Sequence, residues 1–225
     1  MVHISKPHDA DQQARLIDAL RAPNASTRLR AALAAGTTPD PTLVHPLIAR
    51  CGIEPDFFVR DMLTWALIRH PTELTVPELL TELYSGNPQS RSQSLHTLSK
   101  LADKDLWRKV PKSLMHDADD EVARTAWRTA VVLVPHGEEK VLAAELITEL
   151  GRGDRDLKRS LSRALIALDD AIHPLLTAAM NSNDPAIRAH AHATERLMAD
   201  PDSEFTITAE DARRIANTGN ASRDE

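Results

Sequence analysis

Four arginines fall into two pairs with the spacing of one helical turn, Arg124 with Arg128 and Arg159 with Arg163. Residues four apart on a helix are neighbours, so each pair brings together two like charges, which slightly destabilises a helix. Guanidinium groups suit an anionic ligand, because their planar forks form paired hydrogen bonds with phosphate and carboxylate oxygens. The chemistry predicted for these residues is therefore capture of a phosphate, a nucleic-acid backbone or an acidic peptide segment.

Polar and aromatic side chains extend the predicted site. Asp61, Trp65, His96 and Trp127 fall on the same outward face as the arginines when the helices are aligned as described below. A tryptophan ring can also receive a cation on its face. Tryptophan is rarely left fully exposed, however, so a core position is the favoured interpretation for each of Trp65, Trp107 and Trp127.

A structural alternative is that the four arginines pair with acidic residues of neighbouring repeats. Asp61, Glu121, Asp156 and Glu195 are available for such pairs. Ion-pair networks resemble binding sites in their charge pattern, so the sequence alone leaves both interpretations open.

No catalytic residue, metal site or cofactor site is predicted. His190 and His192 are two residues apart and would point to different sides of a helix, unlike the paired histidines of zinc peptidases. The stretch 151–153 contains two glycines but not the continuation of a phosphate loop. Cys51 is expected to be a buried structural thiol. The sequence therefore favours a protein that is not an enzyme.

Composition predicts an all-α protein. Aromatic residues make up only 3% of the 225 residues and there are only 7 glycines, which disfavours a sheet. The formal net charge of -6 disfavours a protein that coats nucleic acid. A single cysteine suits a reducing compartment, and no apolar run suggests a signal peptide or a membrane span, so we expect a cytoplasmic location.

The elements that would position the arginines are helices in a repeated arrangement. Turn residues rich in Asp, Asn, Pro and Gly recur about every fifteen residues, as expected for helix caps. The second helix of each predicted hairpin can be aligned on a dipeptide whose first residues lie 30 to 35 positions apart. These first residues are Thr27, Val59, Ser90, Val122, Leu157 and Ile187. A period of this size predicts a helical solenoid.

The repeat resembles the HEAT-repeat family, including its PBS lyase HEAT-like subgroup and the related armadillo-type repeats. The segments 54–60 and 183–188 carry the resemblance, since each has a turn with Asp and Pro, an apolar residue and then Arg. The resemblance covers roughly residues 11 to 198. It implies an α-α superhelix of about six hairpins, at roughly 11–35, 41–70, 75–102, 105–134, 138–168 and 171–198. The basic residue of the dipeptide is expected to be structural, bridging adjacent turns.

The predicted domain organisation is a flexible N-terminus (1–10), a single repeat domain (11–217) and a disordered tail (218–225). A short helix near 208–217 would close the stack.

The resemblance also implies that the second helices line a concave face. The predicted function is a non-enzymatic adaptor or scaffold that binds a protein partner, or an acidic segment of one, through that face. The ligand-binding residues would be Asp61, Trp65, His96, Arg124, Trp127, Arg128, Arg159 and Arg163. An alternative is nucleic-acid binding, because Asp61, Trp65, Trp127 and Arg128 are similar to the residue types that HEAT-like alkylpurine DNA glycosylases use. A bilin-lyase role follows from the subgroup alone.

Overall fold

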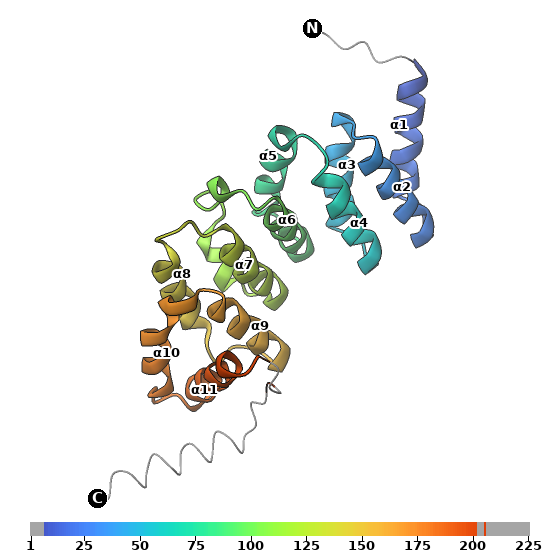
Figure 1. Cartoon of the computed structure of the whole chain (residues 1–225). Coiled ribbons are helices and arrows are strands. Elements are labelled where there is room, and N and C mark those ends of the chain that lie inside the picture. The colour runs from blue at the N-terminus through green and yellow to red at the C-terminus, as the bar shows by residue number, and fades with distance from the viewer. Residues whose placement is uncertain (1–6, 202–204, 206–225) are drawn as a thin grey trace, which may run out of the picture. The chain divides into compact units, whose positions relative to one another are not determined.

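The computed structural model describes residues 7–201 and residue 205. Within these residues the chain forms eleven α-helices joined by short turns and 3-10 segments, with no strand (Figure 1). The chain is thus an all-α helical repeat protein, as its composition and periodicity predict. The chain divides into two compact units, Met1–Pro111 and Lys112–Glu225. The predicted tail at 218–225 and the predicted helix at 208–217 lie outside the described residues.

The unit Met1–Pro111 contains three helical hairpins. Its helices are α1 (Pro7–Leu20), α2 (Ala25–Thr37), α3 (Val44–Cys51), α4 (Phe57–Leu67), α5 (Thr72–Glu82) and α6 (Pro88–Leu101), with 3-10 segments η1 (Pro41–Leu43) and η2 (Lys104–Leu106). The first helix begins at Pro7, within the N-terminal stretch 1–10 that was expected to be flexible.

The unit Lys112–Glu225 begins with a 3-10 segment and continues with two and a half hairpins. Its elements are η3 (Lys112–His116), α7 (Asp120–Leu133), α8 (Glu139–Leu146), η4 (Ile147–Glu149), α9 (Arg155–Ile166), η5 (Asp169–Ile172), α10 (His173–Met180) and α11 (Pro185–Ala199).

The predicted hairpin at 105–134 differs from the others, because no α-helix lies between α6 and α7. Its first half consists of the short 3-10 segments η2 and η3. Pro111 lies between them, where it offers no N–H and disfavours a helical backbone at Val110. The division into two compact units falls at this proline, within the predicted repeat domain 11–217.

Each second helix begins with a side-chain cap. In α2, α4, α6, α7, α9 and α11 an Asn or Asp accepts a hydrogen bond from a backbone N–H two or three residues later. The caps are Asn24, Asp56, Asn87, Asp119, Asp154 and Asp184. Such a cap typically stabilises a helix by about 1 kcal/mol. The predicted alternation of turn residues and helices is confirmed here.

An arginine one turn after the cap closes the turn that precedes it. Its Nη1 donates to the carbonyl oxygen six residues earlier, over 2.8 to 3.0 Å in the first three hairpins. The pairs are Arg28 with Ala22, Arg60 with Glu54, Arg91 with Ser85 and Arg188 with Ser182. We call these four residues the turn arginines. Their expected structural role is confirmed.

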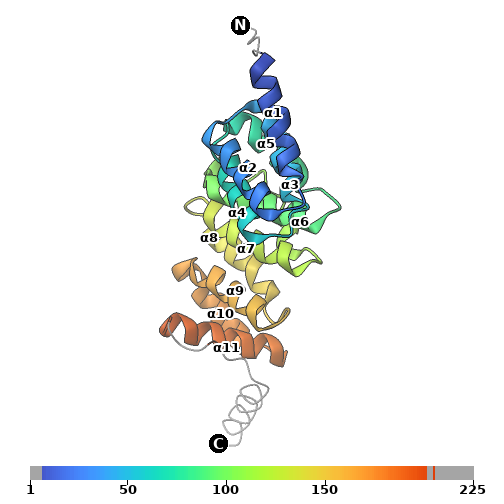
Figure 2. The same ribbon diagram turned by 90° about the vertical axis from the view of Figure 1, so that its right-hand side faces the viewer.

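Stacking of the second helices forms the core of each unit. In the first unit α2 packs on α4 and α4 on α6, and in the second α7 packs on α9 and α9 on α11. Both views show α9 between α7 and α11 (Figure 1, Figure 2). The buried faces carry apolar residues at helical spacing, as in Val59, Leu63 and Leu67 of α4. One hairpin buries its apolar stripe only against the next.

A buried ion cluster joins the first two hairpins. Glu54 is fully buried and accepts hydrogen bonds from Nε and Nη2 of Arg28 at 2.7 Å and from Nε of Arg50 at 2.7 Å. The backbone N–H of Asp56 also donates to Glu54. Burial alone would raise the pKa of Glu54, but these hydrogen bonds outweigh it and lower the pKa to about 2. Glu54 is therefore ionised and holds two guanidinium groups in the turn.

Candidate functional site

Four arginines from two neighbouring helices form the arginine cluster of the second unit. Arg124 and Arg128 lie on α7, and Arg159 and Arg163 lie on α9, which packs against α7. Arg128 and Arg163 are exposed, and Arg124 and Arg159 are half-buried. As predicted, each of the two adjacent helices carries two of these arginines.

A hydrogen bond across the two helices sets the position of Arg128. Its Nε donates to the Oγ of Ser160 on α9 over 3.1 Å. Partial burial lowers the pKa of Arg128, and the positive charges of Arg124 and Arg163 lower it further, against the opposing effect of Glu121. The positive charges of Arg124 on α7 and of Arg163 on α9 therefore both act on Arg128.

Carboxylates compensate little of this charge. Glu121 lies 3.4 Å from Nε of Arg124, and both side chains are partly exposed. Within residues 7–201 and 205, no carboxylate lies within 4.0 Å of Arg128, Arg159 or Arg163. Of the acidic partners considered from the sequence, Glu195 instead lies 3.7 Å from His192 on its own helix. The interpretation as an ion-pair network therefore accounts for Arg124 alone.

In a second charged group of the same unit, carboxylates pair with each of the cationic side chains. Arg152 contacts Glu149 at 2.9 Å and Asp120 at 2.8 Å, and also donates to a backbone carbonyl. His116 bridges Glu145 and Glu149 with two contacts of 2.6 Å, which raise its pKa. The members of this network lie up to 35 residues apart, so no local sequence pattern indicates it. Its geometry is that of a structural tie.

Trp127 does not belong to the exposed face and is a correction to the predicted site. Its side chain has no exposed surface, and its Nε1 donates to the carbonyl oxygen of Met115 over 2.8 Å. The 3-10 segment η3 packs on α7 and encloses the indole. The core position favoured for tryptophan is confirmed here, so Trp127 contacts no ligand from this position.

Asp61, Trp65 and His96 belong to the other unit. Asp61 is exposed on α4, and His96 is half-buried on α6. Trp65 is half-buried between Arg69, whose guanidinium carbon lies 4.9 Å from the ring centroid, and the backbone of Gly36. Any Cβ at residue 36 would come within 2.3 Å of the ring, so this close approach needs glycine. These three residues stay predicted contacts of the first unit, whereas the arginine cluster belongs to the second.

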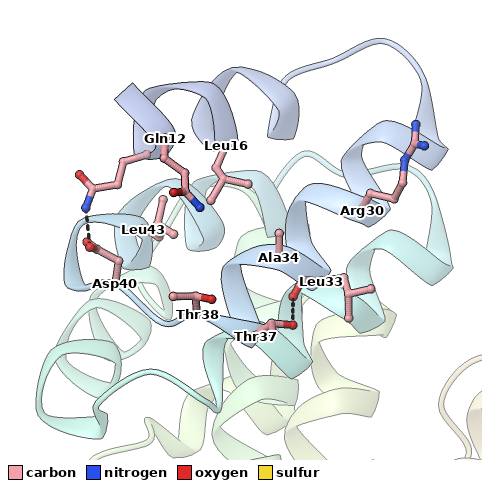
Figure 3. A pocket seen from close by; sticks show the side chains of 10 residues that line it. Gln12, Leu16, Arg30, Leu33, Ala34, Thr37, Thr38, Asp40 and Leu43 are labelled. Atoms are coloured by element: carbon pink, nitrogen blue, oxygen red, sulfur yellow. Dashed lines mark hydrogen bonds between the residues drawn. The ribbon is translucent and has the colours of Figure 1, made fainter. Parts of the chain in front are cut away.

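A pocket in the first unit is a second candidate binding surface (Figure 3). The hollow of about 440 Å³ lies between α1, α2 and η1, where Leu16, Leu33 and Leu43 supply apolar lining. Asp40 on its rim already accepts hydrogen bonds from Gln13 and Thr42. Thr37 donates to the carbonyl of Leu33. Gln13, Thr37 and Asp40 are thus paired within the protein, so only part of the polar lining is left for a ligand.

Cys51 and His190, two groups that could act as nucleophile or metal ligand, are buried. Burial raises the pKa of the Cys51 thiol to about 12, which leaves no thiolate near neutral pH. His190 is fully buried, and burial lowers its pKa to about 4. Its Nδ1 accepts from Gly151 N–H over 3.0 Å, so Nε2 carries the proton and lies 3.0 Å from the carbonyl of Lys158. Among the described residues, no group of three His, Cys, Asp or Glu side chains is arranged to hold a metal ion.

Fold and site together define an all-α helical repeat protein with a largely uncompensated arginine cluster on two adjacent helices. No protein-family model and no curated protein matches the chain. Similar solved structures include two engineered proteins from the Northeast Structural Genomics Consortium. They are 14% and 17% identical over 82% of this chain and 97% and 95% of theirs, with TM-scores of 0.45 and 0.44. No described helix is long and apolar enough to cross a membrane.

The two groups of arginines should respond oppositely to neutralisation. Arg163→Gln is expected to leave the melting temperature unchanged or raise it slightly, because it removes repulsion and breaks no ion pair. Arg152→Gln should instead lower the free energy of unfolding by roughly 1 to 2 kcal/mol, since it removes two ion pairs. Urea unfolding of both variants measures the difference. Equal destabilisation would mean that the arginine cluster is a structural network.

Proposed function

We propose that this protein is a non-enzymatic adaptor that binds an acidic segment of a partner protein through the arginine cluster. The observation that carries the proposal is the absence of carboxylates within 4.0 Å of Arg128, Arg159 and Arg163 among the described residues. Like charges held together without carboxylate partners destabilise a fold. A role in binding therefore explains these arginines better than a role in stability does. Membership of the HEAT-repeat family and a cytoplasmic location are part of the proposal, supported by the repeat period and the single cysteine.

An adaptor role fits the surface on which the cluster lies. Stacked second helices present side chains from successive repeats side by side, and α7 and α9 do so here. An extended peptide laid across them could place one acidic residue against each arginine.

Nucleic-acid binding is the competing function. Two observations weigh against it. Residues 112–225 contain more Asp and Glu than Lys and Arg, whereas duplex affinity comes mostly from neutralising many phosphates. The burial of Trp127 also removes a member of the residue set that suggested a glycosylase.

Fluorescence anisotropy with a labelled glutamate-rich peptide and a labelled DNA duplex tests the proposal over a series of salt concentrations. We expect peptide binding that Arg128→Glu with Arg163→Glu weakens about tenfold or more. The matched control reverses two exposed lysines of the first unit, Lys100→Glu with Lys109→Glu, and should bind like the unaltered protein. Duplex binding with a steep salt dependence that only the arginine variant loses, without peptide binding, would refute the adaptor proposal.

A further inference from the structure

The donor geometry of the arginine cluster distinguishes between acidic ligands. A guanidinium group can present two parallel donor pairs, a side pair formed by Nε and one Nη, and an end pair formed by both Nη atoms. A carboxylate has two coplanar oxygens and pairs with one guanidinium at a time in this bidentate way. The accessible pairs therefore indicate which ligand the cluster fits.

Three of the four arginines cannot present the side pair to a ligand. The Nε of Arg128 is already donated to Ser160 at 3.1 Å. The Nε atoms of Arg124 and Arg159 are buried and make no hydrogen bond among the described residues, and Glu121 already lies 3.4 Å from the Nε of Arg124. For these three residues, only the end pair is left for a ligand. Arg163 is exposed and has no ion-pair partner within 4.0 Å in the described part of the chain.

A phosphoryl group matches this arrangement better than a carboxylate does. It has three terminal oxygens around one phosphorus atom, so end pairs from more than one guanidinium can bind it at once. It also carries about two negative charges at neutral pH, which offsets more of the repulsion between Arg124, Arg128 and Arg163 than one carboxylate can.

The surroundings of the cluster favour a peptide as the source of that phosphoryl group. Glu121 lies beside Arg124, and acidic residues outnumber basic ones over residues 112–225. An extended polyanion would meet repulsion beyond the four arginines, whereas a peptide with one phosphorylated side chain places its charge only there.

We infer that the arginine cluster is a binding site for a phosphorylated serine or threonine in a peptide segment of the partner protein. The inference rests on the proposed adaptor function and specifies its ligand. Arg124, Arg128 and Arg163 would contact the phosphoryl oxygens. Ser160 acts as a positioning residue, because its hydroxyl holds the Arg128 fork across α7 and α9.

Oriented peptide libraries test this inference directly. Three libraries with identical randomised flanks carry phosphoserine, glutamate or serine at the central position, and binding to the full chain is measured at physiological salt. We expect the phosphoserine library to bind at least about tenfold more tightly than the glutamate library. Arg128→Lys keeps the charge but removes the fork, so it should abolish the preference for phosphoserine. The control Lys100→Glu with Lys109→Glu should retain that preference.

The outcomes separate this inference from the adaptor proposal. Equal binding of the phosphoserine and glutamate libraries, lost in Arg128→Glu with Arg163→Glu, overturns the phosphoryl site and leaves the adaptor proposal standing. If no library binds through the arginines, both ideas fail, whether or not duplex DNA binds in their place. Urea unfolding of Arg128→Lys shows whether the variant is folded, and Arg163→Gln provides a second variant of the same cluster.

Discussion

Replacing Glu54 by glutamine should lower the free energy of unfolding by about 3 to 5 kcal/mol. The variant would leave the guanidinium groups of Arg28 and Arg50 against a neutral side chain in a turn where Glu54 has no exposed surface. Removing one member of a buried ion cluster costs more than the cluster contributes, because the remaining charges lose their partner. Urea unfolding followed by circular dichroism measures the change.

Glu73→Gln is the matched control for that variant. Glu73 is exposed in the first turn of α5, so its loss should cost only a few tenths of a kcal/mol through the helix dipole. A Glu54→Gln protein as stable as this control would show that the buried cluster does not hold the turns together.

Glu54 also makes the stability of the folded protein depend on pH in the acidic range. Its pKa is lowered to about 2 in the folded protein, whereas an unfolded glutamate titrates near 4.5. Stability from a lowered carboxyl pKa is fully present above the unfolded value and is lost as the pH falls towards the folded one. The protein should therefore lose stability between about pH 4.5 and 2, and Glu54→Gln should show a smaller loss over that interval. Urea midpoints measured at pH 7, 4 and 3 test this dependence.

Substituting Trp127 by alanine should lower the free energy of unfolding by about 3 to 5 kcal/mol, as expected for a large buried side chain replaced by a small one. The indole has no exposed surface and donates to Met115, so its removal leaves both a cavity and an unpaired carbonyl. Thermal and urea unfolding measure the loss.

Trp127→Phe keeps most of the volume and separates packing from binding. It should be folded, less stable than the unaltered protein, and unchanged in its affinity for the acidic peptide. A loss of peptide affinity in this variant without a loss of stability would mean that Trp127 contacts the ligand after all.

Local signals explain why the helices could be predicted from the sequence. The caps Asn24, Asp56 and Asp184 and the turn arginines make hydrogen bonds within six residues, so their patterns are visible in short stretches of sequence. The site depends on distant partners instead. Glu54 meets Arg28 across 26 residues, and Trp127 is enclosed by a 3-10 segment where the repeat pattern predicts a helix. Pro111 is the sequence signal that could have revealed that irregularity.

Helical spacing predicted the arginine pairs but not their partners. The i, i+4 positions of Arg124 with Arg128 and of Arg159 with Arg163 follow from the period of a helix. Whether an acidic neighbour reaches them depends on side-chain directions between repeats, and in the described residues only Glu121 does.

The local hydrogen bonds of the turn arginines affect how easily such a chain can gain or lose repeats during evolution. Donor and acceptor of each bond lie six residues apart in one hairpin, so a duplicated or deleted gene segment carries both groups with it. The Arg28–Glu54 pair spans two hairpins and would be severed by the same event. Copies of this array can therefore be added most readily where no buried ion pair joins adjacent hairpins.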